Sequence, residues 1–253
     1  MARLLAIAAH PDDETGFAGG FLAKNVAEGN ELYLLEATRG EGGEVGDPPV
    51  GPKSHLGEFR EQEMRCAAAA LGAKEVRFLD FIDPAIEIGE PPLAIAATME
   101  EYASALAAQI AEIRPDILIT HGTNGEYGHP QHVFTHHAVR EALRRLAPWF
   151  PGEVLTWCAN AGVNAEDRIT NRDDPADLTL DVAPWLDRKV AAMECHKSQH
   201  AMFLRNSKAA RVQDMVRKIE AFRRWGREEW LAPEESTSTG GASSDWRVPG
   251  QQK

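Results

Sequence analysis

The chain has 253 residues and a formal net charge of -12, because 39 Asp and Glu residues outnumber 27 Lys and Arg residues. An acidic chain repels phosphate backbones and anionic membranes, so we expect neither as a partner and favour a small neutral substrate or a metal cation. With 43% hydrophobic residues, the chain is long enough to bury a globular core.

Short apolar runs alternate with helical patterns through the first 160 residues. The runs predict strands at residues 4–9, 31–38, 75–81, 116–120 and 154–159. The helical patterns lie between them, at residues 17–27, 57–71, 98–113 and 132–146. Strands separated by helices indicate βαβ units, so we predict an α/β fold with a mostly parallel sheet and helices on both faces.

The pattern is less regular after residue 160. We expect an edge strand at 177–182, a helix at 185–200 and a last amphipathic helix at 212–225. From residue 232 the chain is rich in Ser, Thr, Gly and Pro, which is typical of a flexible tail. We therefore predict one domain over residues 1–231 and a tail over 232–253.

The chain has 3 cysteines, Cys66, Cys158 and Cys195. An odd, sparse set is not a disulfide framework, so we expect a reducing compartment and small buried thiols. The apolar run at the N-terminus is too short for a signal peptide, and no run reaches membrane-spanning length. We therefore expect a cytoplasmic protein.

Polar loops follow the first, second and fourth predicted strands. They cover residues 10–13 (HPDD), 39–44 (RGEGGE) and 121–132 (HGTNGEYGHPQH). In open parallel sheets, ligands gather at the carboxyl ends of the strands. We therefore expect the three loops to converge on one rim and to carry the chemistry.

His10, Asp13 and His132 form a ligand set typical of catalytic zinc, which keeps one coordination position open. A cation would also explain why Asp12 and Asp13 tolerate being adjacent. Asp12 is then free to take a proton from an attacking water. His129 is placed to give a proton to a leaving amine. Acidic residues at a helix start are also typical of simple capping.

Tyr127, five residues before His132, is placed to polarise a carbonyl or to stabilise an oxyanion. Two other readings stay open. Two histidines and one carboxylate also describe a non-haem iron site, although such a site needs no extra acid–base pair. Glycines after the first strand suggest dinucleotide binding, but the G-x-G-x-x-G pattern is absent.

The segments AHPDDE (9–14) and GHPQH (128–132) resemble the LmbE-like or PIG-L family of zinc-dependent N-deacetylases. The resemblance extends over most of the first two hundred residues. It includes ATRGEGGEVGD (37–47), EFREQEMRCAAAALGAKEVRFLDFID (58–83), IRPDILITHG (113–122) and HKSQH (196–200). The resemblance implies a Rossmann-like fold and removal of acetyl groups from N-acetylglucosamine conjugates.

The resemblance also implies roles for single residues. It makes His10, Asp13 and His132 the ligands of one Zn2+ per chain. Asp12 becomes the general base, and His129 becomes the acid or the group that stabilises the oxyanion.

Tyr127 falls where a family member has a tyrosine facing the substrate carbonyl, and Arg60 and Asp83 fall where that member contacts its sugar substrate. Arg60 could equally pair with Glu58 or Glu63 on its own helix. The family usually has an aspartate where this chain has Gln131. We expect Gln131 to orient His129 without supplying charge, so that His129 titrates lower than in relatives with the aspartate.

The sequence therefore predicts a cytoplasmic, zinc-dependent hydrolase. It would remove an N-acetyl group from a small sugar-containing substrate, releasing acetate and a free amine. The alternative is a Rossmann-like protein that binds a metal or small ligand without turnover. The sequence leaves the formation of a homo-oligomer open.

Overall fold

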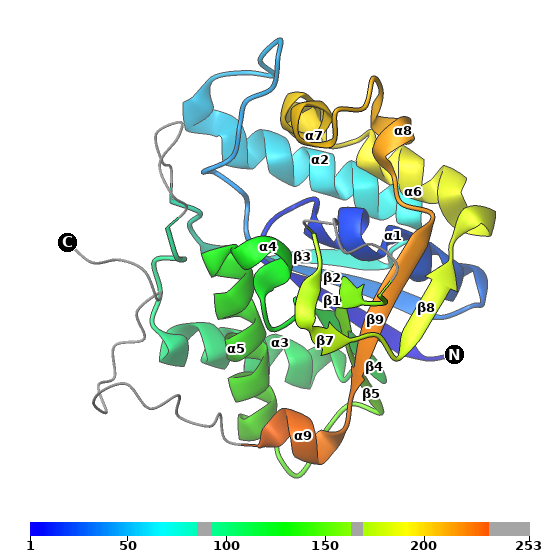
Figure 1. Cartoon of the computed structure of the whole chain (residues 1–253). Coiled ribbons are helices and arrows are strands. Elements are labelled where there is room, and N and C mark those ends of the chain that lie inside the picture. Colours follow the sequence, from blue (N-terminus) through cyan, green and yellow to red (C-terminus); the bar gives the residue numbers. More distant parts are fainter. Residues whose placement is uncertain (85–92, 163–168, 233–253) are drawn as a thin grey trace.

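A seven-stranded sheet with the order β3-β2-β1-β4-β5-β9-β8 organises the chain (Figure 1). The computed structural model describes residues 1–84, 93–162 and 169–232. The parallel strands are β1 (Arg3–Ala8), β2 (Glu31–Thr38), β3 (Glu75–Phe81), β4 (Ile117–Thr120) and β5 (Glu153–Trp157). The antiparallel strands are β8 (Leu178–Asp181) and β9 (Ile219–Trp225). The predicted α/β fold is confirmed.

Helices cover both faces of this sheet. The first face carries α1 (Asp13–Ala27), α2 (Leu56–Leu71) and α6 (Leu186–Met193). The second face carries α3 (Met99–Ile113), α5 (Pro130–Arg145) and α9 (Arg227–Leu231). Shorter elements are α4 (Gly125–Gly128), α7 (His200–Ser207), α8 (Val212–Met215), β6 (Ala159–Asn160), β7 (Asn171–Pro175) and the 3-10 turns Lys53–His55, Ala183–Trp185 and Lys197–Gln199.

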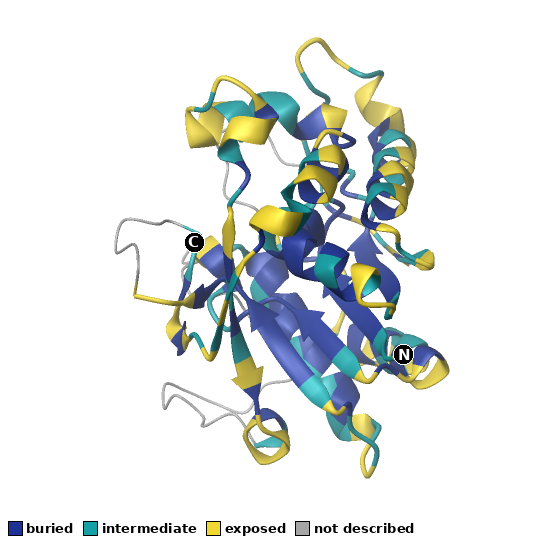
Figure 2. Cartoon of the chain, turned by 90° about the vertical axis from the view of Figure 1, so that its right-hand side faces the viewer, coloured by how far each residue is buried: buried dark blue, intermediate teal, exposed yellow. Residues whose placement is uncertain are grey.

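Strand β1 is buried on both faces, because successive side chains point to opposite sides. Leu4 and Ala6 pack in the cluster that includes α1 and α2, whereas Leu5 and Ile7 pack against α3 and α5. Figure 2 shows the strands of the sheet as the buried centre of the molecule. The continuous apolar run at residues 4–9 is explained by this double burial.

The chain reverses its direction across the sheet between β1 and β4. Strands β2 and β3 lie on one side of β1, and β4 and β5 lie on the other. Such a reversal opens a crevice outside the carboxyl ends of the two central strands. The residues after β1 and β4 are therefore neighbours at this crevice.

The helix predicted at 212–225 is wrong. Only Val212–Met215 are helical, and Ile219–Trp225 form β9, which pairs with β5 and β8. Its side chains alternate, since Glu220 and Phe222 are buried whereas Ile219 is 49% exposed. This segment forms a strand because it pairs with β5 on one side and with β8 on the other, and both partners are distant in the sequence. The strand predicted at 177–182 is confirmed at the sheet edge.

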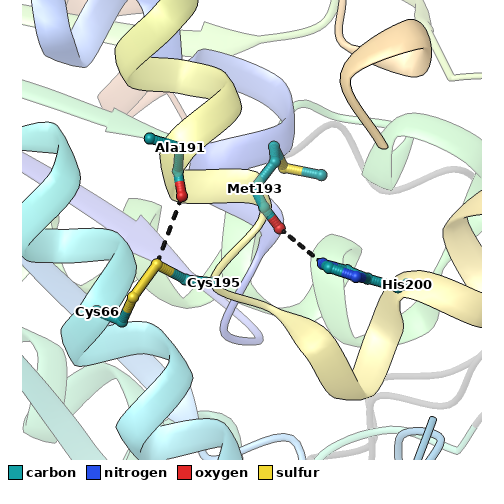
Figure 3. The surroundings of a disulfide bond; sticks show 5 residues. All are labelled: Cys66, Ala191, Met193, Cys195 and His200. Carbon is teal, nitrogen blue, oxygen red and sulfur yellow. Dashed lines mark hydrogen bonds between the residues drawn. A yellow bond between two sulfur atoms is a disulfide. The ribbon is translucent and has the colours of Figure 1, made fainter. Parts of the chain in front are cut away.

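A disulfide joins Cys66 of α2 to Cys195, which follows α6 (Figure 3). The expectation that these two cysteines are free thiols is wrong, so the cysteines no longer favour a reducing compartment. Cys158 is buried and takes no part in the disulfide, as expected. The cytoplasmic location stays a prediction.

Within residues 1–84, 93–162 and 169–232, no helix is long and apolar enough to cross a membrane. Residues 233–253 of the predicted tail (232–253) lie outside the described residues. The division into one domain and a tail therefore stays a prediction.

A buried ion pair attaches β9 to α1 and α6. The Glu220 carboxylate accepts hydrogen bonds from Lys189 Nζ at 2.7 Å and from the backbone N–H groups of Gly20 and Phe21 at 2.8 Å each. Both charged side chains are almost fully buried. Removing one partner of a buried pair leaves an uncompensated charge.

We predict that Lys189→Met lowers the free energy of unfolding by about 3–5 kcal/mol in urea titrations, because Glu220 is left buried and unpaired. Lys74→Met is the control, since the Lys74 side chain is 53% exposed and pairs with Glu31 at 2.6 Å. Its cost should stay below about 1 kcal/mol. Equal costs for the two variants would contradict the buried pair.

Candidate active site

The three polar loops converge at the crevice, as the sequence predicts. They border a pocket of about 160 Å³. Eight of the nine predicted site residues line it, namely His10, Asp12, Asp13, Arg60, Asp83, Tyr127, His129 and Gln131. The ninth, His132, is fully buried and its ring lies 5.3 Å from that of His10. The pocket is also lined by Gly42 and Gly43 from the loop after β2.

His10, Asp13 and His132 bring three metal-ligating groups together. His10 Nδ1 lies 3.2 Å from Asp13 Oδ2, and His132 Nε2 lies 3.3 Å from both Asp13 Oδ1 and His10 Nδ1. All three side chains are buried. Two imidazole nitrogens and a carboxylate facing one another fit the donor set of a divalent metal such as zinc.

The electrostatics of this cluster favour a cation between the groups. Burial raises the pKa of Asp13, but His132 and His10 outweigh it and hold that pKa well below its usual value. Burial likewise lowers the pKa of His132, but Asp13 and Glu126 outweigh it and raise that pKa to about 10. The cluster therefore holds a positive charge strongly.

Two other groups of residues have ligand atoms within 4.8 Å of one another, and both include His132. The first group consists of His132, His121 and Asp13. Both ring nitrogens of His121 are engaged, since Nε2 accepts the backbone N–H of Ala9 at 3.0 Å and Nδ1 lies 2.9 Å from Glu126 Oε2. His121 is therefore not available as a ligand.

The second group adds His129 to His10 and His132. Its ring lies 4.4 Å from that of His132, and Nδ1 has no hydrogen-bond partner within the described residues. Burial and the charges of His132 and His10 hold the pKa of His129 well below its usual value. His129 is therefore held neutral beside the pocket.

Asp12 is held by its backbone and by Arg60. Its φ of 119° is rare for a residue with a side chain, although Asp and Asn tolerate positive φ better than most. Arg60 Nη2 donates to Asp12 Oδ2 at 2.9 Å. Asp12 precedes α1 but makes no capping hydrogen bond with its side chain, so simple capping does not explain it. Burial raises the pKa of Asp12, and Arg60 partly offsets this.

Arg60 is buried and donates to three acceptors. Besides Asp12, it bonds the carbonyl oxygens of Gly40 and Pro11. The alternative pairing with Glu58 or Glu63 is not found, since Glu58 contacts His55 and Glu63 accepts from Ser198. Arg60 thus holds Asp12 in place at the wall of the pocket.

Gln131 contacts His10 and not His129, so the expected contact with His129 is wrong. The Gln131 amide nitrogen donates to Asp83 Oδ1 at 2.7 Å and to the Leu93 carbonyl at 3.0 Å. Its oxygen therefore faces His10 Nε2, at 3.0 Å. Because an amide oxygen only accepts, His10 carries a hydrogen on Nε2, and in the neutral ring the lone pair lies on Nδ1, the nitrogen that faces Asp13.

Asp83 and Tyr127 both line the pocket but differ in their exposure and contacts. The Asp83 carboxylate accepts from Gln131 and from the backbone N–H of Gly42 at 3.0 Å. Tyr127 is 53% exposed, and its ring lies 5.7 Å from that of His129. Asp83 is thus occupied by protein donors, whereas Tyr127 is accessible.

Glu126 and His121 also belong to the site, although the sequence does not predict a role for either. Glu126 is fully buried between His121 and His132. Burial raises the pKa of its carboxyl group, but the two histidines outweigh this and hold that pKa well below its usual value. An acidic residue inside a glycine-rich loop carries no periodic signal, so only the fold shows that it is buried.

Solved structures show that this fold is shared by a class of α/β enzymes. One is N,N'-diacetylchitobiose deacetylase from Pyrococcus horikoshii, with a TM-score of 0.64 and 17% identity over 91% of this chain and 85% of that one. Another is the 4-carboxy-2-hydroxymuconate hydratase GalB from Pseudomonas putida, with a TM-score of 0.60 and 20% identity over 95% of this chain and 100% of that one. At these identities the likeness shows the fold alone.

Sequence comparison identifies the family. Residues 5–143 match the model of PIG-L, GlcNAc-PI de-N-acetylase. A 1D-myo-inositol 2-acetamido-2-deoxy-alpha-D-glucopyranoside deacetylase from Mycolicibacterium smegmatis is 34% identical over 232 residues, which cover 78% of this chain and 80% of that one. The chain belongs to the PIG-L family, and the resemblance seen in its motifs is confirmed.

We predict that Gln131→Leu lowers zinc affinity about 10- to 100-fold, because His10 loses the acceptor that fixes its orientation. Competition with a chromogenic chelator measures this. Gln109→Leu is the control, since Gln109 on α3 accepts from Arg77 at 2.8 Å and lines no part of the pocket. An affinity of Gln131→Leu equal to that of the wild type would refute the positioning of His10 by Gln131.

Proposed function

We propose that this chain is a metal-dependent hydrolase that removes an N-acetyl group from a small sugar-containing substrate and releases acetate and a free amine. The observation that carries the proposal is the convergence of His10 Nδ1, the Asp13 carboxylate and His132 Nε2 beneath a pocket. The M. smegmatis relative acts on an acetamido sugar joined to inositol, by its name, which supports a substrate of this class.

The donor set of two imidazoles and one carboxylate fits zinc. A divalent metal held there would polarise the amide carbonyl and lower the pKa of an attacking water. Asp12 takes the proton of that water as the bond from oxygen to the carbonyl carbon forms. Arg60 holds the Asp12 carboxylate in place for this step.

His129 and Tyr127 act on the carbonyl oxygen. A neutral imidazole is a suitable N–H donor to the oxyanion, and the low pKa of His129 supports this role over protonation of the amine. Tyr127 reaches the same oxygen from the accessible side of the pocket. As the carbon–nitrogen bond breaks, the proton held by Asp12 passes to the amine nitrogen. Acetate and the free amine result.

We predict that the purified protein binds about one Zn2+ per chain, and that Asp13→Ala and His132→Ala both lose it, since each variant removes one of three ligands. Elemental analysis of the dialysed protein measures this. Cys158→Ser serves as a control, because Cys158 is a buried thiol that belongs to neither group of potential ligands. A wild-type protein that stays metal-free after zinc is added would overturn the proposed function.

We predict that Asp12→Asn keeps the zinc and lowers kcat by about 10²–10⁴-fold, which is the usual contribution of a general base. Asn tolerates the positive φ at residue 12, so the fold should be retained. Acetate release from acetylated amino sugars measures turnover. If a substrate is turned over equally by the variant, Asp12 is not the base. A zinc-loaded wild type with no turnover on any acetylated sugar would favour the binding protein.

A further inference from the structure

Glu126 is a buried carboxylate surrounded by four donors. Its Oε2 lies 2.6 Å from His132 Nδ1 and 2.9 Å from His121 Nδ1. Its Oε1 accepts from the backbone N–H of Gly122 at 3.0 Å and from Asn171 Nδ2 at 3.2 Å. An ionised carboxylate only accepts hydrogen bonds, so each of these four groups must present a hydrogen to it.

A backbone group independently determines where His121 carries its hydrogen. The N–H of Ala9, just after β1, donates to His121 Nε2 at 3.0 Å. Nε2 must therefore offer its lone pair, and the ring hydrogen lies on Nδ1. That hydrogen points at Glu126 Oε2. The orientation of the Glu126 carboxylate is thus connected to the end of the central strand.

The same oxygen then determines the hydrogen of His132. Because Glu126 Oε2 accepts, His132 carries a hydrogen on Nδ1. In the neutral ring that binds a metal, the lone pair therefore lies on Nε2, which is 3.3 Å from both His10 Nδ1 and Asp13 Oδ1. We propose that Glu126 is a positioning residue that holds His132 in the tautomer and orientation in which Nε2 binds the metal. This inference rests on the proposed metal site.

The backbone conformation of Glu126 is unfavourable and is stabilised by a neighbouring side chain. Its φ of 61° and ψ of -48° are rare for a residue with a side chain and cost free energy. Asn171 of β7 compensates, since its Oδ1 accepts the N–H of Glu126 at 3.0 Å while its Nδ2 bonds the Glu126 carboxylate. One side chain therefore holds both the backbone and the carboxylate of Glu126.

The test is the zinc affinity of Glu126→Gln, measured by competition with a chelator. A glutamine has one acceptor oxygen and two N–H hydrogens, so it cannot satisfy four donors. We expect affinity to fall about 10- to 100-fold, as for other groups that orient a metal-binding histidine.

Asp174→Asn is the matched control. Asp174 is also a fully buried carboxylate, and it holds the same loop by accepting from the N–H and the hydroxyl of Thr123 at 2.9 and 2.8 Å. None of its hydrogen bonds or ion pairs within the described residues involves His132. We expect this variant to lose stability and to keep the zinc affinity of the wild type.

The outcomes separate the inference from the proposed function. A wild type that binds no zinc overturns the proposed function. A wild type that binds zinc while Glu126→Gln binds it equally well overturns the inference alone. Equal losses in Glu126→Gln and Asp174→Asn also overturn it, because the effect would then come from anchoring of the loop.

A second measurement needs no variant that folds poorly. In the zinc-loaded wild type labelled with ¹⁵N-histidine, NMR should find the hydrogens of His121 and His132 on Nδ1. A hydrogen on Nε2 of His132 would overturn the inference even if every variant failed to fold.

Discussion

Three electron-pair donors meet in a buried space, and the rest of the site is arranged around this contact. The Asp13 carboxylate lies 3.2 Å from His10 Nδ1 and 3.3 Å from His132 Nε2, so a positive charge, a proton or a metal cation, has to lie between these groups. In a medium of low polarity the buried carboxylate would be costly without that charge. The three groups meet because Asp13 and both rings follow β1 and β4, whose ends meet where the sheet reverses its order.

The two histidines are oriented from opposite sides by the same principle. Gln131 accepts from the outer nitrogen of His10, and Glu126 accepts from the outer nitrogen of His132. Each acceptor is in turn oriented through a backbone group, the Leu93 carbonyl in one case and the Ala9 N–H, acting through His121, in the other. These hydrogen bonds to backbone groups thus also turn His10 Nδ1 and His132 Nε2 towards Asp13.

Much of this architecture is predictable from local pattern, and the exceptions share a cause. The strand at 31–38 has the predicted bounds, because an apolar run buried on both faces carries its own signal. The strand at 75–81 also has the predicted bounds, although it lies at the sheet edge and only Leu79 is buried. β9 is an exception: three of the seven residues in its sequence IEAFRRW are charged, and this segment forms a strand by pairing with β5 and β8. The motifs indicated the candidate ligands, whereas the contacts of Arg60, Gln131 and Glu126 join residues 6 to 121 positions apart. Such contacts follow from the fold and not from spacing.

The disulfide between Cys66 and Cys195 gives the molecule two possible unfolded states. It closes a loop whose ends are 129 residues apart, and that loop contains His132 but neither His10 nor Asp13. A covalent loop of this length removes chain entropy from the unfolded ensemble, worth roughly 4–5 kcal/mol in the entropic model. The oxidised and the reduced protein therefore share one native fold but unfold to two different ensembles, one with the closed loop and one without it. The stability of this protein is a property of the chain together with the redox state of its surroundings.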